Sequence, residues 1–246
     1  METLLSVVRE TDKAKNFIGY VVRLAQDLKV RIRLMYVQEA YEYTIGQPPA
    51  PETYTIDNLK EREEEAGMEL RAIVSEVLEE LPGEVSLEYS TEVASTASVI
   101  DEYYTANRKG LVVLEGEEQK NILLPGPSVN DIIDATDCPV LIIPENVKYS
   151  SFRKIVYATD YKAKDIKSLK SLIELMSGLS PSITALHIVG KPESEELISE
   201  SGFKEMLKAE TGYNKISVKL LEAAENENAP QLIRDYLQEI NADWLC

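Results

Sequence analysis

Hydrophobic positions along the chain follow two periods, one typical of strands and one typical of helices. The short runs with the length and β-branched composition of strands are 3–8, 30–37, 85–93, 110–114 and 139–143. The segments that repeat apolar residues at helical spacing are 14–28, 57–81, 97–107 and 128–135. Strands that alternate with helices predict βαβ units in a mainly parallel sheet. The runs 110–114 and 139–143 are almost wholly apolar, which fits strands covered on both faces.

Turn and cap residues separate these segments. Thr11 and Asp12 stand just before the helix predicted over 14–28, where we expect them to cap it. Pro82 and Gly83 follow the long helix predicted over 57–81 and are expected to end it. The stretch 38–54 contains one glycine and three prolines and predicts a loop.

The chain also repeats itself. With an offset of 151 residues, Leu4 falls on Ile155 and Ile32 falls on Ile183 without a gap. Further along, the expected offset decreases to 131, where Val85 meets Ile216, and then becomes 133 in the following helix. A strand, a helix and a strand in register, followed by a further strand and helix, indicate a tandem duplication.

The duplication predicts two doubly wound α/β domains, over residues 1–146 and 151–246. At the offset of 133, residues 244–246 fall on residues 111–113, so the second copy is expected to lack its last helix and strand. An apolar strand left at an open sheet edge is unfavourable in a soluble protein. We therefore expect the native polypeptide to continue by roughly 30 residues, as the first copy implies.

Charge narrows the range of partners. The chain carries 26 Lys and Arg residues against 43 Asp and Glu residues, a formal net charge of −17. Such a surface repels nucleic acid and anionic lipid, and no basic patch offsets it. The sequence shows neither a basic leader nor a long apolar span, so we expect a cytoplasmic protein that binds neither nucleic acid nor membrane. Cys138 and Cys246 are interpreted as buried, reduced thiols.

The order of short motifs resembles the universal stress protein family over nearly the whole chain. In the second copy the resemblance rests on residues 155–160 (IVYATD), 185–189 (ALHIV) and 242–245 (ADWL). In the first copy it rests on residues 34–37 (LMYV), 110–113 (GLVV) and 138–144 (CPVLIIP). The resemblance implies two tandem Rossmann-like domains, similar to the adenine nucleotide alpha hydrolase-like fold, that pair as a pseudo-dimer.

The resemblance also implies a nucleotide site, which the first copy retains only in degenerate form. Nucleotide-binding members hold the nucleoside with an Asp after the first strand and a hydrophobic residue in the second strand. They wrap the phosphates in a Gly-x2-Gly-x9-Gly-Ser/Thr loop, whose backbone N–H groups approach the phosphate oxygens. Carried over to the first copy, this loop retains Gly116, Gly126 and Ser128, but Val113 replaces the first glycine and Pro127 precedes Ser128.

Charges in the first copy also disfavour ATP. Arg9 stands at the position of the Asp, and Glu115, Glu117 and Glu118 lie where phosphates would bind. Arg9 is interpreted either as the ligand of another anion or as the salt-bridge partner of these glutamates, and the salt bridge is favoured.

The second copy retains the nucleoside half of the site in Thr159, Asp160 and Ile188. ATP or AMP is the ligand that the resemblance implies for this copy. Asp160 has an equally good interpretation as the cap of the helix that follows it. The single histidine, His187, ends a strand without an acid or a thiol at catalytic spacing and is interpreted as structural.

No enzyme motif is present in the sequence: Gly-x-Gly-x-x-Gly, a Walker loop and a nucleophile–base–acid set are all absent. We therefore expect a non-catalytic protein, and the resemblance implies a stress-response module that acts through pseudo-dimeric domains, homo-oligomers or unknown protein partners. The alternatives are an adenine-nucleotide sensor that uses a completed second domain and a scaffold that has lost both sites. Tyr41, Tyr43 and Tyr54 are candidates for an exposed patch.

Overall fold

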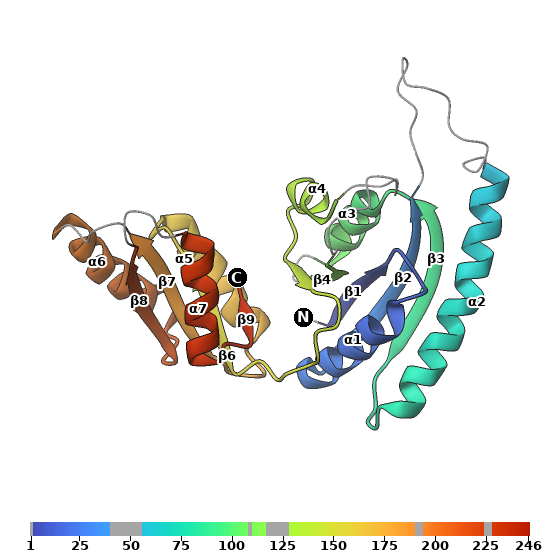
Figure 1. Ribbon diagram of the computed structural model, residues 1–246, viewed down its shortest axis with the longest axis horizontal. Coiled ribbons are helices and arrows are strands. Elements are labelled where there is room, and N and C mark those ends of the chain that lie inside the picture. Colours follow the sequence, from blue (N-terminus) through green and yellow to red (C-terminus); the bar gives the residue numbers. More distant parts are fainter. Residues whose placement is uncertain (1, 40–55, 108–109, 117–127, 190–193, 224–227) are drawn as a thin grey trace, which may run out of the picture. The chain divides into compact units, whose positions relative to one another are not determined.

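The computed structural model describes residues 2–39, 56–107, 110–116, 128–189, 194–223 and 228–246. The chain divides into two compact units, Met1–Tyr149 and Ser150–Cys246. Each unit is an α/β fold built on its own parallel sheet (Figure 1). The predicted loop over 38–54 and its three tyrosines lie outside the described residues, except that Gln38 and Glu39 belong to a strand.

The first unit has a sheet of five parallel strands in the order β3-β2-β1-β4-β5. Its strands are β1 (Thr3–Val8), β2 (Arg31–Glu39), β3 (Leu87–Ala94), β4 (Leu111–Glu115) and β5 (Val140–Ile143). Its helices are α1 (Ala14–Leu28), α2 (Ile56–Glu80), α3 (Thr96–Ala106) and α4 (Val129–Asp134). The element order therefore confirms the doubly wound α/β prediction.

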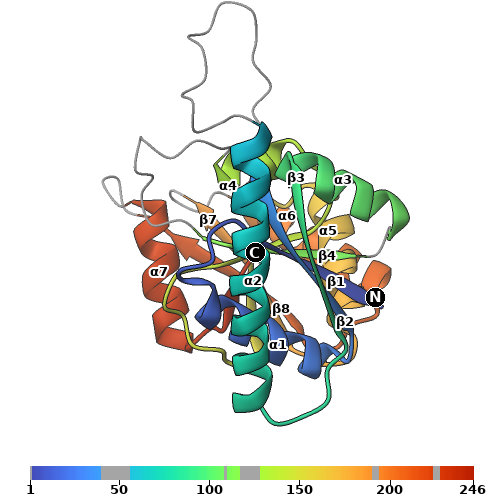
Figure 2. The ribbon, with the colours of Figure 1, turned by 90° about the vertical axis from the view of Figure 1, so that its right-hand side faces the viewer.

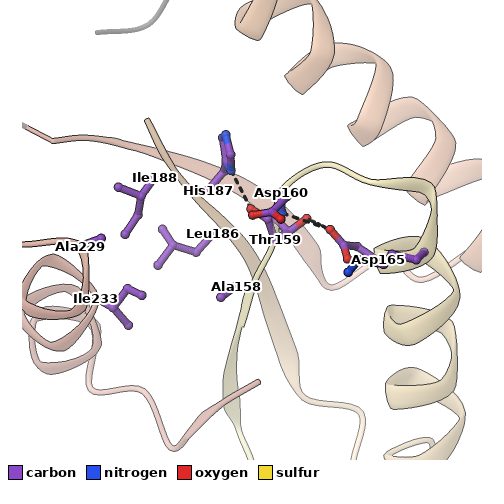
Figure 3. Close-up of a pocket in the computed structure, with 10 residues that line it drawn as sticks. Ala158, Thr159, Asp160, Asp165, Leu186, His187, Ile188, Ala229 and Ile233 are labelled. Atoms are coloured by element: carbon purple, nitrogen blue, oxygen red, sulfur yellow. Dashed lines mark hydrogen bonds between the residues drawn. The ribbon is translucent and has the colours of Figure 1, made fainter. Parts of the chain in front are cut away.

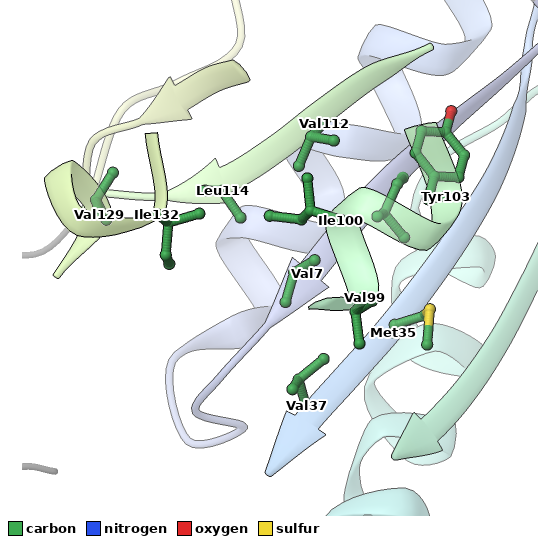
Figure 4. Packing of buried hydrophobic residues seen from close by; sticks show 11 residues of the cluster. Val7, Met35, Val37, Val99, Ile100, Tyr103, Val112, Leu114, Val129 and Ile132 are labelled. Atoms are coloured by element: carbon green, nitrogen blue, oxygen red, sulfur yellow. The ribbon is translucent and has the colours of Figure 1, made fainter. Parts of the chain in front are cut away.

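Helices cover both faces of the first sheet. On one face, α1 and α2 contact each other, and α2 lies against β2 and β3 (Figure 2). On the other face, α3 and α4 enclose a continuous apolar cluster (Figure 4). The residues of this cluster are Leu5, Val7, Met35, Val37, Val99, Ile100, Tyr103, Val112, Leu114, Val129 and Ile132. Because strand side chains alternate between faces, Leu5 and Val7 of β1 both enter this cluster.

The second unit has a sheet of four parallel strands in the order β8-β7-β6-β9. Its strands are β6 (Lys154–Ala158), β7 (Ser182–Val189), β8 (Ile216–Glu222) and β9 (Trp244–Leu245). Its helices are α5 (Ala163–Leu175), α6 (Ser194–Thr211) and α7 (Ala229–Ile240). The unit thus has a last helix and strand, α7 and β9, while its described residues contain no counterpart of α4 or β5.

Strand register shows the duplication directly. Leu4 pairs with Ile32 in the first sheet, and Ile155 pairs with Ile183 in the second, so the same pair recurs 151 residues later. Leu111 pairs with Leu4 as Trp244 pairs with Ile155, which confirms the offset of 133.

The predicted offset of 131 for the third strand is wrong. Ile32 pairs with Leu87, whereas Ile183 pairs with Ile216, so Leu87 rather than Val85 is the counterpart of Ile216 and the offset is 129. An offset that differs by two residues keeps every side chain on the same face of a strand, so the hydrophobic pattern alone does not separate the two alignments.

The predicted caps of α1 are also wrong. The residue before the helix is Lys13, whose side chain makes no capping hydrogen bond. Thr11 instead donates its hydroxyl to the Glu69 carboxylate of α2, and its carbonyl oxygen accepts the Ala14 N–H. Thr11 has a side chain that could cap α1, but its hydroxyl group binds Glu69 of α2 instead.

Candidate functional site

The connection between β6 and α5 is held by one buried carboxylate. Asp165, in the first turn of α5, is 7% exposed. Its Oδ2 accepts hydrogen bonds from the Thr159 hydroxyl at 2.8 Å and from the backbone N–H groups of Asp160 at 3.1 Å and Lys162 at 3.2 Å. The Thr159 hydroxyl oxygen in turn accepts the Tyr161 N–H at 3.0 Å. These bonds satisfy three backbone donors and fix the loop that leaves β6.

An aromatic group packs against the same loop. The Tyr161 ring lies 4.4 Å from the His187 ring and 4.9 Å from the Phe203 ring, measured between centroids. Tyr161 has a φ of 57°, a left-handed conformation that a bulky residue adopts rarely. Burial raises the pKa of its phenol to about 12. The loop is therefore tightly held although its backbone is strained.

Asp160 points out of this loop. Its carboxylate accepts a hydrogen bond of 2.7 Å from Lys162 Nζ, and the side chain is 64% exposed. This bond and the charge of Lys162 lower the pKa of Asp160, so the group is a carboxylate at neutral pH. The carboxylate remains reachable by a ligand because a surface ion pair of this kind is weak.

The loop forms one edge of a pocket of about 420 Å³ (Figure 3). The pocket lies at the carboxyl ends of β6 and β7, where ligands of open α/β sheets bind, and is bordered by the N-terminal parts of α5 and α7. Its lining residues are Ala158, Thr159, Asp160, Lys164, Asp165, Leu186, His187, Ile188, Ala229 and Ile233. The apolar side chains from β7 and α7 make one wall, and the polar groups gather at the end of β6.

All three residues predicted for the second copy line this one pocket, but in different roles. Ile188 contributes to the apolar wall and Asp160 lies at the polar edge. The Thr159 side chain is 7% exposed and its hydroxyl is bound to Asp165, so it shapes the loop. The alternative interpretation of Asp160 as the cap of α5 is wrong, because Lys162 precedes the helix and Asp165 accepts the capping bonds.

Sequence reasoning missed Asp165 and the contribution of α7. An acid at the third position of a predicted helix is a known capping signal, and Asp165 carries it. Ala229 and Ile233 are one helical turn apart on the predicted helix face, which could have suggested that this face reaches the site. The wall that they form depends on the packing of α7 on the sheet.

In the first unit, the residues predicted for a phosphate loop have structural roles. The Gly116 N–H donates to the Ile143 carbonyl oxygen at 2.7 Å, and a Cβ on Gly116 would lie 3.1 Å from Ile142 Cγ2. Ser128 caps α4: its hydroxyl oxygen accepts the Asp131 N–H at 3.1 Å, and its own N–H donates to the Asp131 carboxylate. Gly126 lies outside the described residues. In the described part of this loop, Gly116 therefore links the end of β4 to β5, and Ser128 starts α4.

Carboxylates gather where the first unit would bind phosphate. Burial, together with the charges of Glu145 and Glu10, raises the pKa of Glu115 to about 7. The charges of Lys13 and Arg9 oppose this rise, and Lys13 Nζ lies 3.5 Å from the Glu145 carboxylate. Arg9 thus belongs to the electrostatic surroundings of Glu115, while Glu117 and Glu118 lie outside the described residues.

The described residues contain no group of three or more His, Cys, Asp or Glu side chains that could hold a metal ion. None of the helices described is long and apolar enough to cross a bilayer.

Solved structures provide the comparison for this geometry. A universal stress protein from Archaeoglobus fulgidus superposes with a TM-score of 0.62 and 16% identity, over 99% of this chain and 83% of that one. The fold is that of the universal stress proteins. A putative universal stress protein from Pseudomonas aeruginosa gives a TM-score of 0.54 at 14% identity, over 100% of this chain and 81% of that one.

The same fold occurs in a protein of another kind. The cytoplasmic domain of a prokaryotic cation chloride cotransporter matches with a TM-score of 0.52 and 13% identity, over 98% of this chain and 93% of that one. No family model and no curated protein matches the sequence. The universal stress protein fold is thus shared by proteins with different tasks, and the task of this chain has to be argued from its site.

Proposed function

We propose that this protein is a non-catalytic stress-response module of the universal stress protein type whose second unit senses an adenine nucleotide, ATP or AMP. The observation that carries the proposal is the meeting of Asp160 and Ile188 in one pocket of about 420 Å³. That volume lies within the range of about 300 to 1,000 Å³ that small-ligand sites occupy.

The pocket has the chemistry of a nucleoside site. Apolar side chains of Leu186, Ile188 and Ile233 offer a wall against which a flat purine ring can pack. At the opposite edge, the Asp160 carboxylate accepts hydrogen bonds and suits the amino or hydroxyl donors of a nucleoside. A wall without donors and an edge with an ionised acceptor together favour an uncharged, donor-bearing ring system over an isolated anion.

The first unit does not fit the same ligand. Arg9 replaces the acceptor at the end of β1, and Glu115 stands at the end of β4, where phosphate oxygens would come close. Carboxylates repel a polyphosphate by about 1 kcal/mol each even in water. A single nucleotide per chain, held by the second unit, follows from this asymmetry.

A module without catalysis agrees with the chemistry of the site. The His187 ring uses Nδ1 on the Thr159 carbonyl oxygen, and the Thr159 hydroxyl is donated to Asp165. The Thr159 hydroxyl thus donates to a carboxylate that holds the loop and not to His187, so these two groups do not form a nucleophile–base pair. We infer that the bound ligand changes contacts with partners and is not converted.

A second candidate function is a partner-binding module that needs no ligand and whose two units pair as a pseudo-dimer. The observation that favours it is the exposure of Leu245 on β9, which is 49%, whereas its counterpart Val112 on β4 is fully buried. Exposed apolar side chains of this kind mark interaction surfaces when they belong to a larger patch.

Calorimetric titration of the full chain with ATP, AMP and adenosine separates the two candidates. The sensor proposal expects one site per chain and a loss of affinity of at least about tenfold in Asp160→Asn, since a hydrogen bond to a charged acceptor is removed. Asp235→Asn is the matched control, because it makes the same change on an exposed part of α7 and is expected to bind as the wild type. Absence of binding by the wild type would reject the sensor and leave the partner-binding module.

A further inference from the structure

We propose that His187 is a positioning residue that holds the loop Thr159–Lys162 and thereby sets the direction of Asp160 in the pocket. What the loop binds rests on the proposed function, whereas the positioning itself is a property of the free protein. Two contacts of His187 carry the proposal, one through a ring nitrogen and one through the face of the ring.

The first contact joins the ends of two neighbouring strands. His187 Nδ1 lies 2.6 Å from the carbonyl oxygen of Thr159 (Figure 3). A carbonyl oxygen can only accept, so Nδ1 must carry the proton in this contact. The bond follows the last regular pairing of the two strands, in which the Thr159 N–H donates to the Leu186 carbonyl oxygen at 2.9 Å. Through this bond, His187 attaches one more backbone group of the loop, the Thr159 carbonyl, to β7.

The second contact supports the strained residue of the loop. The ring of His187 packs on Tyr161, whose φ of 57° is unfavourable for a side chain of this size. The Tyr161 hydroxyl is buried and has no hydrogen-bond partner in the part of the chain that the structure describes. Tyr161 is thus kept in place by ring packing, with no help from its hydroxyl. Strain of this kind persists only where the surroundings determine the conformation, and His187 is part of those surroundings.

Asp165 also holds the loop, and it binds different backbone groups from those that His187 binds. The carboxylate of Asp165 binds the N–H groups of Asp160 and Lys162, whereas His187 binds the carbonyl oxygen of Thr159. Asp160 lies between these attachments, so the backbone on both sides of its side chain is fixed. A ligand that hydrogen-bonds the Asp160 carboxylate then meets an acceptor whose position is already set, which lowers the entropic cost of binding.

The first unit provides an internal comparison. The register of the strands places Val8 at the position of Thr159 and Tyr36 at the position of His187. Tyr36 donates its hydroxyl to Gln38 of its own strand at 3.0 Å. At the same offset of 151 residues, Ala14 replaces Asp165 and Arg9 replaces Asp160. The first unit therefore has no carboxylate at the position of Asp160, and it also lacks the two side chains, Asp165 and His187, that hold the loop in the second unit.

Two substitutions separate the contacts of His187. His187→Asn retains a donor close to the position of Nδ1 but removes the ring, whereas His187→Phe retains a ring and removes the donor. In His187→Phe we expect the amide protons of Asp160, Tyr161 and Lys162 to exchange about tenfold faster, as the loss of one hydrogen bond implies. In His187→Asn we expect exchange to be only about threefold faster than in the wild type, because the donor remains and only the ring packing on Tyr161 is lost. Equal effects of both variants, or none, would overturn the proposal.

The tautomer of His187 in the wild type tests the proposal even if a variant does not fold. The chain contains one histidine, so the side-chain ¹⁵N signals of His187 need no assignment. The proposal requires the proton on Nδ1 in the neutral ring, and a proton on Nε2 would overturn it.

Titration with adenosine then tests the link to the pocket. Where the wild type binds adenosine, His187→Phe is expected to lower the affinity about tenfold and His187→Asn to restore most of it. Equal affinity of His187→Phe and the wild type would overturn the link. If the wild type binds none of ATP, AMP and adenosine, the proposed function fails, and the amide exchange and the tautomer still decide whether His187 positions the loop.

Discussion

The hydroxyl group of Thr159 donates to the carboxylate of Asp165 over 2.8 Å, and both side chains are buried. A buried carboxylate is tolerated only where several donors surround it, and here the backbone N–H groups of Asp160 and Lys162 complete the set. The geometry of the candidate site therefore depends on a buried carboxylate that both holds the loop and lines the pocket.

Replacement of this carboxylate should destabilise the second unit. In Asp165→Ala three donors lose their acceptor, and we expect the free energy of unfolding to fall by about 3 kcal/mol. Urea unfolding followed by Trp244 fluorescence measures this, because the only tryptophan of the chain lies in the second unit. Asp160→Ala is the control: its carboxylate is exposed, and we expect a clearly smaller loss. Equal losses in the two variants would contradict the role assigned to Asp165.

The contact between Phe152 and Trp244 should contribute strongly to the same unit. Phe152 is 2% exposed, and its ring meets the Trp244 ring edge to face at a centroid distance of 3.7 Å. Phe152→Ala is expected to cost about 3 to 4 kcal/mol, since it leaves a cavity in the core. Phe152→Leu retains most of the volume and is expected to cost less than about 1.5 kcal/mol. Chemical denaturation followed by Trp244 fluorescence would refute this if Phe152→Ala cost no more than Phe152→Leu.

Glu115 should make the stability of the first unit depend on pH. Its pKa is raised to about 7 from the ordinary value of 4.5, chiefly by burial. The folded state therefore takes up a proton before the unfolded state as the pH falls. The stabilisation by the neutral acid is full below pH 4.5 and is lost as the pH rises through about 7.

Glu115→Gln isolates this effect because the amide is uncharged at every pH. We expect the variant to gain stability relative to the wild type as the pH rises from 4.5 to above 7. Circular dichroism records the unfolding, and a transition that Trp244 fluorescence does not follow belongs to the first unit. A difference between the two proteins that is constant over this range would show that Glu115 keeps its ordinary pKa.

Removal of two buried hydroxyl groups of the first unit should affect the free energy of unfolding differently. Ser6 is fully buried and its hydroxyl has no partner among the described residues, whereas the Thr96 hydroxyl, also fully buried, donates to the Glu39 carboxylate. Ser6→Ala is expected to leave the free energy of unfolding unchanged or to raise it by up to about 1 kcal/mol. Thr96→Val is expected to lower it by about 1 to 2 kcal/mol, because an acceptor loses its donor. Thermal unfolding of both variants checks the signs, and a destabilised Ser6→Ala would indicate a missed hydrogen bond.

Much of the fold follows from the one-dimensional pattern. The predicted bounds of β1 and α1, Thr3–Val8 and Ala14–Leu28, agree with the structure because both segments bury a regular set of apolar side chains. The offsets of 151 and 133 agree with the strand register for the same reason. The third strand was displaced by two residues, since β3 and β8 lie at sheet edges and carry a weaker pattern.

The sequence by itself determined which elements form and that the chain is duplicated, because both depend on periodicity and on the order of strands along the chain. The prediction that Thr159, Asp160 and Ile188 form one site came from the resemblance to the universal stress proteins. The tertiary structure alone decided that Asp165 and His187 hold the loop, that α7 borders the pocket and that Gly116 and Ser128 serve packing and capping. Such roles arise from contacts between segments distant in sequence, or from which of several capable side chains reaches a backbone group, and these depend on how the helices pack on the sheet.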